Sequence, residues 1–285
     1  MKTILIPTDF STTALNAAKY ISDFCRKTGT ERLILYHSYE MFHHGIDPIL
    51  INDILIPPPS QLDELKDEAI NKLIVLKETL GPLVNKNVVI EYVTNDLPII
   101  EGINQIIIKE KVDLVTIGIS GSGNNHKNII GGNTLKIMRE CDISLLIIPP
   151  TATFNGIEKS MLACDLHDIA ERLPLDQLKE LILKLSSKLL VVNVEHDETM
   201  SPNTLMKEET ILHRMLDDIN PEYYYLDDKN KAEGLLMFAK KQMANLIIVV
   251  HRKRGLVEQV FHNSITKKLA FKTSIPLFIL HRIKK

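Results

Sequence analysis

Residues 4–11 read ILIPTDFS, and their pattern is the clearest indication of how the chain folds. A short aliphatic run ends at a proline and an aspartate and leads directly into a helix-length amphipathic segment, residues 12–27. Such strand-like and helical segments alternate along the whole chain, which is typical of a parallel sheet with crossover helices. In the first half the further strands are expected at 32–37, 88–93, 114–119 and 144–148, and the further helices near 62–80, 99–111 and 133–140. The sequence therefore predicts an α/β fold.

The second half of the chain repeats this order. Asp9 corresponds to Asp165 at an offset of 156 residues, and from the third helix onward Gly102 corresponds to Gly234 at an offset of 132. The difference between the two offsets falls after the second strand. Residues 41–61, which include three consecutive prolines, are therefore interpreted as an insertion loop of the first copy.

Two domains follow from the repeat. Pro149 and Pro150 cannot continue a central strand, so a linker is expected at about 150–157 between domains at 1–150 and 158–285. Duplicated domains commonly pack as an intramolecular pseudo-dimer, and a homodimer of the whole chain is compatible with this arrangement. The candidates for pairing at the sheet edges are the last strands, 145–148 and 277–280.

Charge and hydropathy exclude several classes of function. The 285 residues contain 34 Lys and Arg against 36 Asp and Glu, a net charge of −2, which argues against nucleic acid as a partner. No stretch approaches the roughly 20 apolar residues that span a bilayer, so we expect a cytoplasmic protein without a membrane partner. Cys25, Cys141 and Cys164 have no metal-type spacing and are expected to be reduced structural thiols.

Glycines follow the fourth strand and lead into a helix. Gly118, Gly121 and Gly131 precede Gly132-Asn133-Thr134, a spacing that matches neither the Walker loop nor the dinucleotide fingerprint. Glycine lets the main chain approach a phosphate, and the free N–H groups at a helix start favour anions. The motif favours a polyphosphate ligand, although glycines also mark ordinary turns.

With residues 4–11, this Gly motif and the strand order of both halves, the chain resembles the universal stress protein family in its ATP-binding branch. The resemblance implies two tandem flavodoxin-like (Rossmann-like) domains, each a five-stranded parallel sheet with helices on both faces. It further implies a regulatory role in the stress response and an adenine nucleotide as ligand, ATP or else AMP or ADP, with which Mg²⁺ can bind.

The same resemblance assigns the site residues. Asp9 would accept hydrogen bonds from the sugar hydroxyls, with the cap of the first helix as its other role. Where the family usually has Ser or Thr after the third glycine, this chain has Gly132, so one phosphate contact is missing or comes from Thr134. The implied set places Pro7, Thr8 and Asp9 against the adenosine, Ser38 beside the base, and Gly118, Gly121, Gly131, Gly132, Asn133 and Thr134 around ribose and phosphates.

The second copy has lost the glycines. Val250, Lys253 and Asn263 stand where the first copy has Gly118, Gly121 and Gly131. A β-carbon obstructs close approach to phosphate, so the second half is interpreted as a degenerate copy for packing or dimerisation. Binding of another anionic ligand at the basic cluster 252–254 remains the alternative.

No acid–base pair, nucleophile triad or metal site is indicated by spacing. His43, His44 and Asp47 are interpreted as a polar loop rather than a zinc site. His126 and Lys127 are the nominees for assisting phosphoryl chemistry, with solvated loop residues as the plainer interpretation. A nucleotide-binding regulator is therefore favoured over a slow ATPase and over a ligand-free dimerising scaffold.

Overall fold

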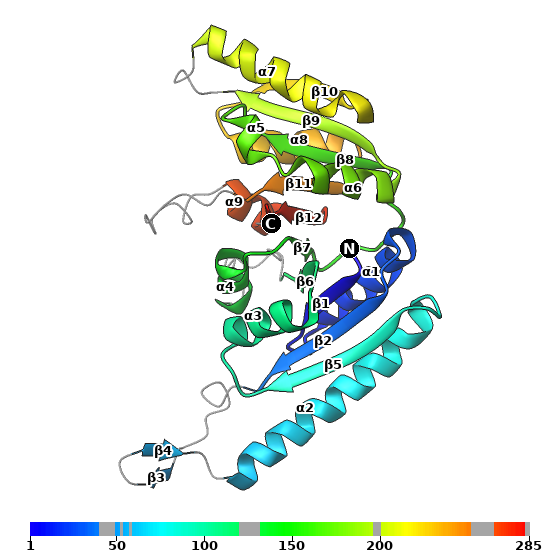
Figure 1. The fold of residues 1–285 in the computed structure, drawn as a ribbon, viewed down its shortest axis with the longest axis vertical. Coiled ribbons are helices and arrows are strands. Elements are labelled where there is room, and N and C mark those ends of the chain that lie inside the picture. The colour runs from blue at the N-terminus through cyan, green and yellow to red at the C-terminus, as the bar shows by residue number, and fades with distance from the viewer. Residues whose placement is uncertain are drawn as a thin grey trace.

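The computed structural model describes residues 1–39, 49–51, 54–56, 59–119, 132–195, 201–251 and 265–282. Its body is one ten-stranded sheet with helices on both faces (Figure 1). The strand order is β10-β9-β8-β11-β12-β7-β6-β1-β2-β5, so the two halves of the chain occupy the two halves of the sheet. Each half contributes five parallel strands in the order third, second, first, fourth, fifth. The predicted fold class is confirmed.

The first half follows the predicted element order closely. Its strands are β1 (Thr3–Pro7), β2 (Arg32–Ser38), β5 (Val89–Asn95), β6 (Leu114–Gly118) and β7 (Leu145–Ile148). Its helices are α1 (Thr12–Thr28), α2 (Pro59–Leu80), α3 (Ile99–Glu110) and α4 (Gly132–Glu140), with a 3-10 turn at Gly81–Leu83.

The second half repeats this order with one change in its first helix. Its strands are β8 (Lys159–Cys164), β9 (Lys188–Glu195), β10 (Glu222–Asp227), β11 (Leu246–Val250) and β12 (Leu277–Leu280). Its helices are α5 (Ile169–Arg172), α6 (Leu175–Leu185), α7 (Pro202–Leu216), α8 (Lys231–Lys241) and α9 (Ile265–Lys272), with a 3-10 turn at Asp217–Ile219. The counterpart of α1 is divided between α5 and α6 because Pro174 has no N–H to donate and its ring obstructs a continuous helix.

The two halves meet through their last strands. β7 and β12 pair antiparallel, with Phe278 opposite Leu146 and Leu277 opposite Ile147, whereas the other pairs of the sheet are parallel. The pairing expected for strands 145–148 and 277–280 is therefore present. Because both central strands are paired within the chain, the sheet ends at β5 and β10.

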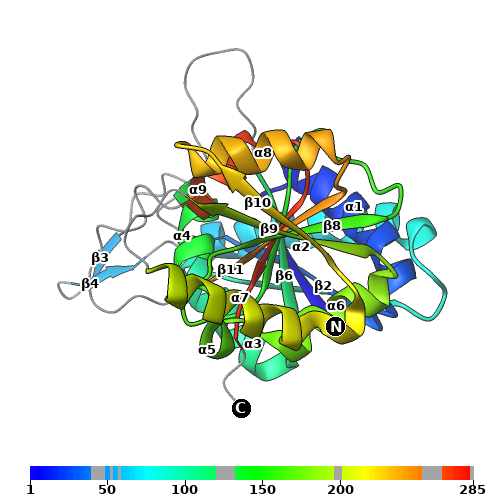
Figure 2. The same ribbon diagram turned by 90° about the horizontal axis from the view of Figure 1, so that it is seen from above.

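Alternate residues of the strands supply two hydrophobic cores. Ile4 and Ile6 of β1 lie in the core covered by α1, α2, α6 and α7, whereas Leu5 lies in the core covered by α3, α4, α8 and α9. All three side chains are fully buried. Figure 2, viewed from above, shows the strands of the twisted sheet fanning out around the centre, with the helices of both halves around them. Strands that are apolar on both faces are what a doubly covered parallel sheet requires.

The region after β2 is more than the predicted loop. β3 (Ile49–Ile51) and β4 (Ile54–Ile56) form a separate antiparallel hairpin, and α2 begins at Pro59. Proline is well suited to a first helical turn, where its missing N–H has no partner to lose. The prediction of an insertion loop over 41–61 was therefore wrong for the hairpin and for the start of α2.

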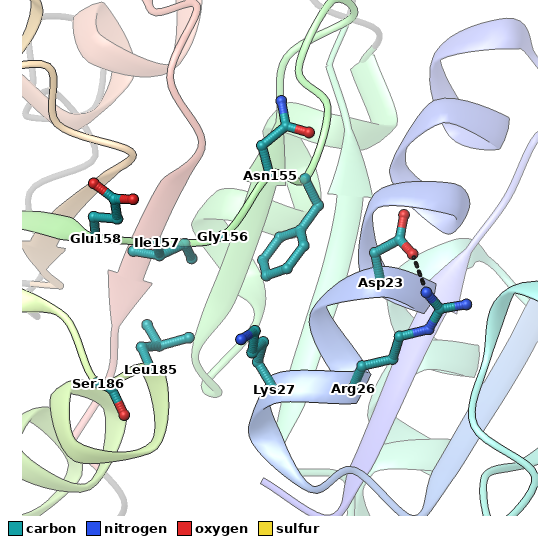
Figure 3. Close-up of a pocket in the computed structure, with 10 residues that line it drawn as sticks. Asp23, Arg26, Lys27, Asn155, Gly156, Ile157, Glu158, Leu185 and Ser186 are labelled. Atoms are coloured by element: carbon teal, nitrogen blue, oxygen red, sulfur yellow. Dashed lines mark ion pairs between the residues drawn. The ribbon is translucent and has the colours of Figure 1, made fainter.

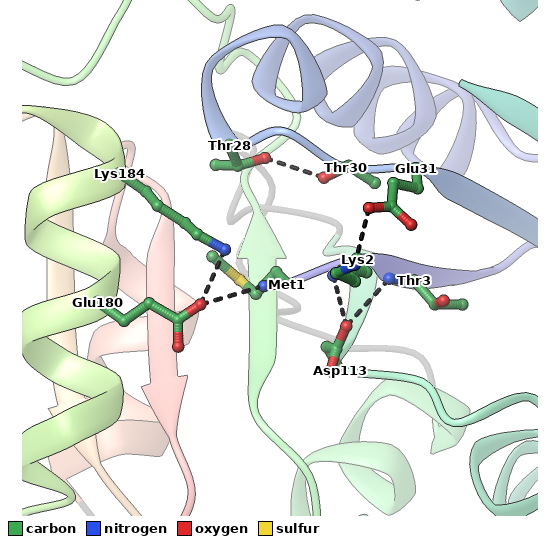
Figure 4. A network of polar contacts seen from close by, with 9 residues as sticks. All are labelled: Met1, Lys2, Thr3, Thr28, Thr30, Glu31, Asp113, Glu180 and Lys184. Atoms are coloured by element: carbon green, nitrogen blue, oxygen red, sulfur yellow. Dashed lines mark hydrogen bonds and ion pairs between the residues drawn. The ribbon is translucent and has the colours of Figure 1, made fainter. Parts of the chain in front are cut away.

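Polar contacts hold the beginning of β1 (Figure 4). The ammonium group of Met1 lies 3.5 Å from Glu180 Oε1 of α6, which also pairs with Lys184 Nζ at 2.8 Å. Burial lowers the pKa of this ammonium group most, and the nearby Lys184 lowers it further. Asp113 accepts the N–H of Thr3 at 3.0 Å. These contacts join the first strand to its neighbour and to the second half.

Within the described ranges, no helix is both long and apolar enough to cross a membrane.

Candidate functional site

The turn after β1 fixes the position of Asp9. Thr8 is buried, and its N–H donates to the Tyr36 carbonyl at 2.8 Å. Its hydroxyl accepts the N–H of Phe10 at 3.0 Å, and Phe10 takes the left-handed conformation with φ 60°. The chain therefore turns sharply beyond the carboxyl end of β1 and leaves the Asp9 side chain exposed.

Asp9 supports the first helix without being its cap. Ser11 is the N-cap of α1, and its hydroxyl accepts the N–H of Ala14 at 3.2 Å. Asp9 Oδ1 in turn accepts from the N–H of Ser11 at 3.0 Å and from its hydroxyl at 2.5 Å. The alternative role considered for Asp9, the cap itself, was wrong, because Ser11 provides it. Only one oxygen of the Asp9 carboxylate takes part in these bonds.

His37 of β2 links the end of this strand to the turn after β1. It is not among the site residues that the resemblance implied. Its Nδ1 lies 2.8 Å from the Thr8 carbonyl, and since a carbonyl oxygen only accepts, Nδ1 carries the proton. Its ring lies 4.6 Å from the ring of Phe10, and Lys72 Nζ lies 5.6 Å from that Phe10 ring. The sequence did contain one sign of this role, namely an aromatic, polar residue at the carboxyl end of the second strand.

Ser38 ends β2 at the same edge. Its hydroxyl donates to the Leu97 carbonyl at 2.5 Å, in the segment between β5 and α3. The proton of this hydroxyl is therefore already used, and only its oxygen lone pairs could serve a ligand.

Gly118 serves packing. It ends β6, the parallel neighbour of β1, and a β-carbon at this position would stand 2.3 Å from the Thr13 carbonyl oxygen of α1. No side chain fits such an approach to backbone. The glycine therefore makes room for the first turn of α1, and the phosphate contact that the resemblance implied for Gly118 stays a prediction.

The start of α4 completes the edge on the other side of β1. Gly132 and Asn133 are exposed and Thr134 is half-buried, and none of the described residues lies within 4 Å of a β-carbon placed on Gly132. Because α4 follows β6, its N-terminal end belongs to the carboxyl edge that also carries Asp9. Other predicted residues lie outside the described ranges: Gly121, Gly131, His126 and Lys127 near α4, and His43, His44 and Asp47 after β2.

The corresponding edge of the second half is built differently. Val250 ends β11 where Gly118 ends β6, and the short α5 stands where the first turn of α1 would. The Glu208 carboxylate of α7 accepts the N–H of Ile169 at 2.9 Å, so an anionic side chain of the chain itself occupies this helix start. Asn193 replaces His37 and donates to the Cys164 carbonyl at 3.0 Å. Lys253 and Asn263 lie outside the described ranges.

A cavity of about 530 Å³ lies elsewhere, between α1, the linker and the end of α6 (Figure 3). Lys27, Phe154 and Leu185 line it, together with an ion pair of Arg26 with Asp23 at 3.3 Å. Asp23 is twelve helical positions beyond Ser11, a rise of about 18 Å along α1. The cavity is therefore separate from the Asp9 edge.

Neither metal nor thiol chemistry is indicated in the described ranges. No three His, Cys, Asp or Glu side chains gather there as metal ligands. All three cysteines are free and buried, in agreement with their prediction as structural thiols. Burial raises the pKa of Cys25 and of Cys141 to about 12, so both are protonated at neutral pH.

The sequence model of the universal stress protein family matches residues 1–149 of the 285-residue chain. The chain belongs to this family. The family membership is what the Asp9 turn and the strand order had indicated. No curated protein matches the chain.

Solved structures share the tandem fold of this universal stress protein. One is a universal stress protein from Archaeoglobus fulgidus DSM 4304, with a TM-score of 0.72 at 17% identity over 98% of each chain. Another is a functionally unknown protein from Pseudomonas aeruginosa PAO1, with a TM-score of 0.60 at 12% identity over 99% of this chain and 93% of the other. A third is the cytoplasmic domain of a prokaryotic cation chloride cotransporter, with a TM-score of 0.55 at 12% identity over 98% and 94%. At these identities the likeness shows the fold alone.

Proposed function

We propose that this universal stress protein binds an adenine nucleotide, ATP or else AMP or ADP, at the carboxyl edge of β1, β2 and β6, and acts as a regulator of the stress response. The position is the one at which open parallel sheets hold ligands, beyond the carboxyl ends of the strands. The second half, with Val250 at the end of β11 and Glu208 at its first helix start, serves as the structural partner of the first.

The geometry of Asp9 carries the proposal. Its main chain is fixed from both sides, by the bonds of Thr8 and by the Ser11 cap, while its side chain is exposed at the edge. One carboxylate oxygen is engaged by Ser11, and the other is suited to accept from the two hydroxyls of a ribose. Preorganisation of this kind reduces the entropy lost on binding.

The phosphates belong at the start of α4 in this proposal. Asn133 and Thr134 offer side-chain donors there, and the free N–H groups of the first helical turn favour negative charge. A Mg²⁺ ion bound with ATP would take most of its ligands from phosphates and water, as this ion usually does.

Titration calorimetry with ATP, ADP and AMP tests the proposal. Asp9→Asn keeps the oxygen that accepts from Ser11 but removes the charge, so the fold should be retained. Hydrogen bonds to charged groups are worth about 1.5–3 kcal/mol, and affinity should fall about tenfold or more.

Asp165→Asn is the matched control, because Asp165 occupies the equivalent position of the second half. Its affinity for nucleotide should equal that of the wild type. Equal losses in both variants, or no heat of binding for any of the three nucleotides with the wild-type chain, would rule out the proposed site.

A further inference from the structure

The cavity between the end of α1, the linker and the end of α6 lies where the two halves of the chain meet. The first half contributes Lys27, the linker contributes Phe154 and Ile157, and the second half contributes Leu185. The volume of about 530 Å³ falls in the range of roughly 300–1,000 Å³ that is typical of small-molecule sites. Because α1 leads into β2 here, the cavity belongs to the amino edge of the sheet, opposite the edge that carries Asp9.

One wall of the cavity is apolar and firmly packed. Ile157 and Leu185 are only 5% and 7% exposed, and both belong to the core on the α1 face of the sheet. Phe154 is half-buried, and its ring meets the rings of Tyr20 and Phe24 edge-on, with ring centroids 5.3 Å and 6.0 Å apart. Close packing of this kind holds the wall in place. The wall therefore offers a preformed surface to the apolar part of a ligand.

The side of the cavity formed by α1 carries a cation. Two basic residues lie in the last turn of this helix, and Arg26 pairs with Asp23 at 3.3 Å. Among the residues that the structure describes, none forms an ion pair or hydrogen bond with the Lys27 side chain. Figure 3 shows Lys27 on the side of α1 that faces Leu185, whereas the Arg26 side chain points away toward Asp23. The Lys27 ammonium group is therefore available to a ligand.

The two carboxylates of the lining do not cancel this charge. Asp23 is neutralised by its ion pair with Arg26. The Glu158 side chain lies on the far side of Ile157 from Lys27 (Figure 3). The charge that faces the apolar wall is therefore positive.

We propose that this cavity binds a small carboxylate with an apolar body. The carboxylate pairs with Lys27, and the apolar body lies against Phe154 and Leu185. The ion pair gains strength beside an apolar wall, where the ligand displaces water. Such a ligand contacts both halves and the linker at once, so its binding stabilises their arrangement. The site shares no residue with the Asp9 edge, and the inference stands independently of nucleotide binding.

Fluorescence titration of the full chain with anilinonaphthalene sulfonate tests the inference. This probe is an aromatic anion whose fluorescence rises in apolar surroundings, and the wild type should bind it saturably. Octanoate should displace the probe. Octanol and octylammonium have the same apolar chain without the negative charge, so they should displace it about fivefold less effectively or worse.

Variants of Lys27 locate the site. Lys27→Gln removes the charge and should weaken octanoate binding about fivefold, whereas Lys27→Arg retains the charge and should bind like the wild type. Lys19→Gln is the matched control, because Lys19 is an exposed lysine of the same helix that does not line the cavity. It lies about 12 Å farther away along the helix axis, and its replacement should leave binding unchanged.

Four results would overturn the inference. The first is the absence of saturable probe binding by the wild type. The second is equal displacement of the probe by octanoate and octanol. The third is an equal loss of octanoate binding in Lys27→Gln and Lys19→Gln. The fourth is displacement of the probe by ATP but not by octanoate, which would assign the probe to the Asp9 edge.

Discussion

Gly118 and Thr13 approach so closely that a β-carbon on Gly118 would stand 2.3 Å from the Thr13 carbonyl oxygen. The contact brings the carboxyl end of β6 against the first turn of α1, beside the cap formed by Ser11. The second half has Val250 at the equivalent position, and there the counterpart of α1 is divided into α5 and α6 at Pro174. The loss of this glycine and the altered helix therefore occur together.

Gly118→Ala should destabilise the protein. The added β-carbon meets backbone atoms, which cannot rotate away, and overpacking of this kind costs about 1–3 kcal/mol or somewhat more. Denaturant unfolding followed by circular dichroism measures the loss. Gly132→Ala is the control, because its β-carbon meets no atom of the described residues and alanine is the better helix former by up to about 1 kcal/mol. Equal stability of the two variants would refute the packing role of Gly118.

Gly132→Ser should strengthen nucleotide binding. The family pattern usually has a hydroxyl here, the position is the first of α4, and none of the described residues obstructs a side chain there. One added hydrogen bond contributes about 0.5–1.5 kcal/mol, which corresponds to an increase in affinity of up to about tenfold. Gly132→Ala separates the effect of the hydroxyl from that of the β-carbon in the same titration. An increase shared by both variants would show that the hydroxyl makes no contact.

The thiols of Cys25 and Cys141 should resist alkylation in the folded protein. Burial raises the pKa of both to about 12, so at pH 8 almost no thiolate is present. Mass spectrometry after iodoacetamide treatment should show labelling of these two residues only when denaturant is added. Rapid labelling at pH 8 without denaturant would contradict their burial.

The same two thiols should make the free energy of unfolding depend on pH. In the unfolded chain a cysteine loses its proton near pH 8.5. Between about pH 8.5 and about pH 12 the folded state therefore retains protons that the unfolded state has released, so the free energy of unfolding falls as pH rises. Replacing Cys25 by Ala should reduce this slope when unfolding is measured at several pH values. An unchanged slope would assign the pH dependence to other groups.

Much of this fold follows from local patterns in the sequence. The aliphatic runs such as 4–6 and the offset between Asp9 and Asp165 predicted the strands, their order and the repeat, because period and spacing are local properties of a chain. The close contact of Gly118 with Thr13 was not predictable, since it depends on how a strand end and a helix meet in space. The hairpin was missed because runs of three residues between prolines are too short to separate strand from loop.

The candidate site was predicted only in part. Residues 7–9 and Ser38 do come to one sheet edge, as parallel topology requires. His37 was not predicted, because its hydrogen bond to the Thr8 carbonyl joins two segments that are distant in the sequence. The spacing of residues along the chain does not reveal such a bond. The capping role considered for Asp9 belongs to Ser11, two residues further on, since the exact helix start depends on backbone angles that a sequence pattern does not resolve.

Nucleotide binding is tested most simply by identifying the small molecules that the purified protein carries. Protein prepared without added ligand is heated to release bound small molecules, and these are identified by mass spectrometry for the wild type and for Gly121→Val. The wild type should release about one adenine nucleotide per chain, because one of the two halves keeps the proposed site, and the variant should release none. Nothing released from the wild type, together with an unchanged melting temperature when ATP is added, would contradict nucleotide binding and leave the chain as a ligand-free scaffold.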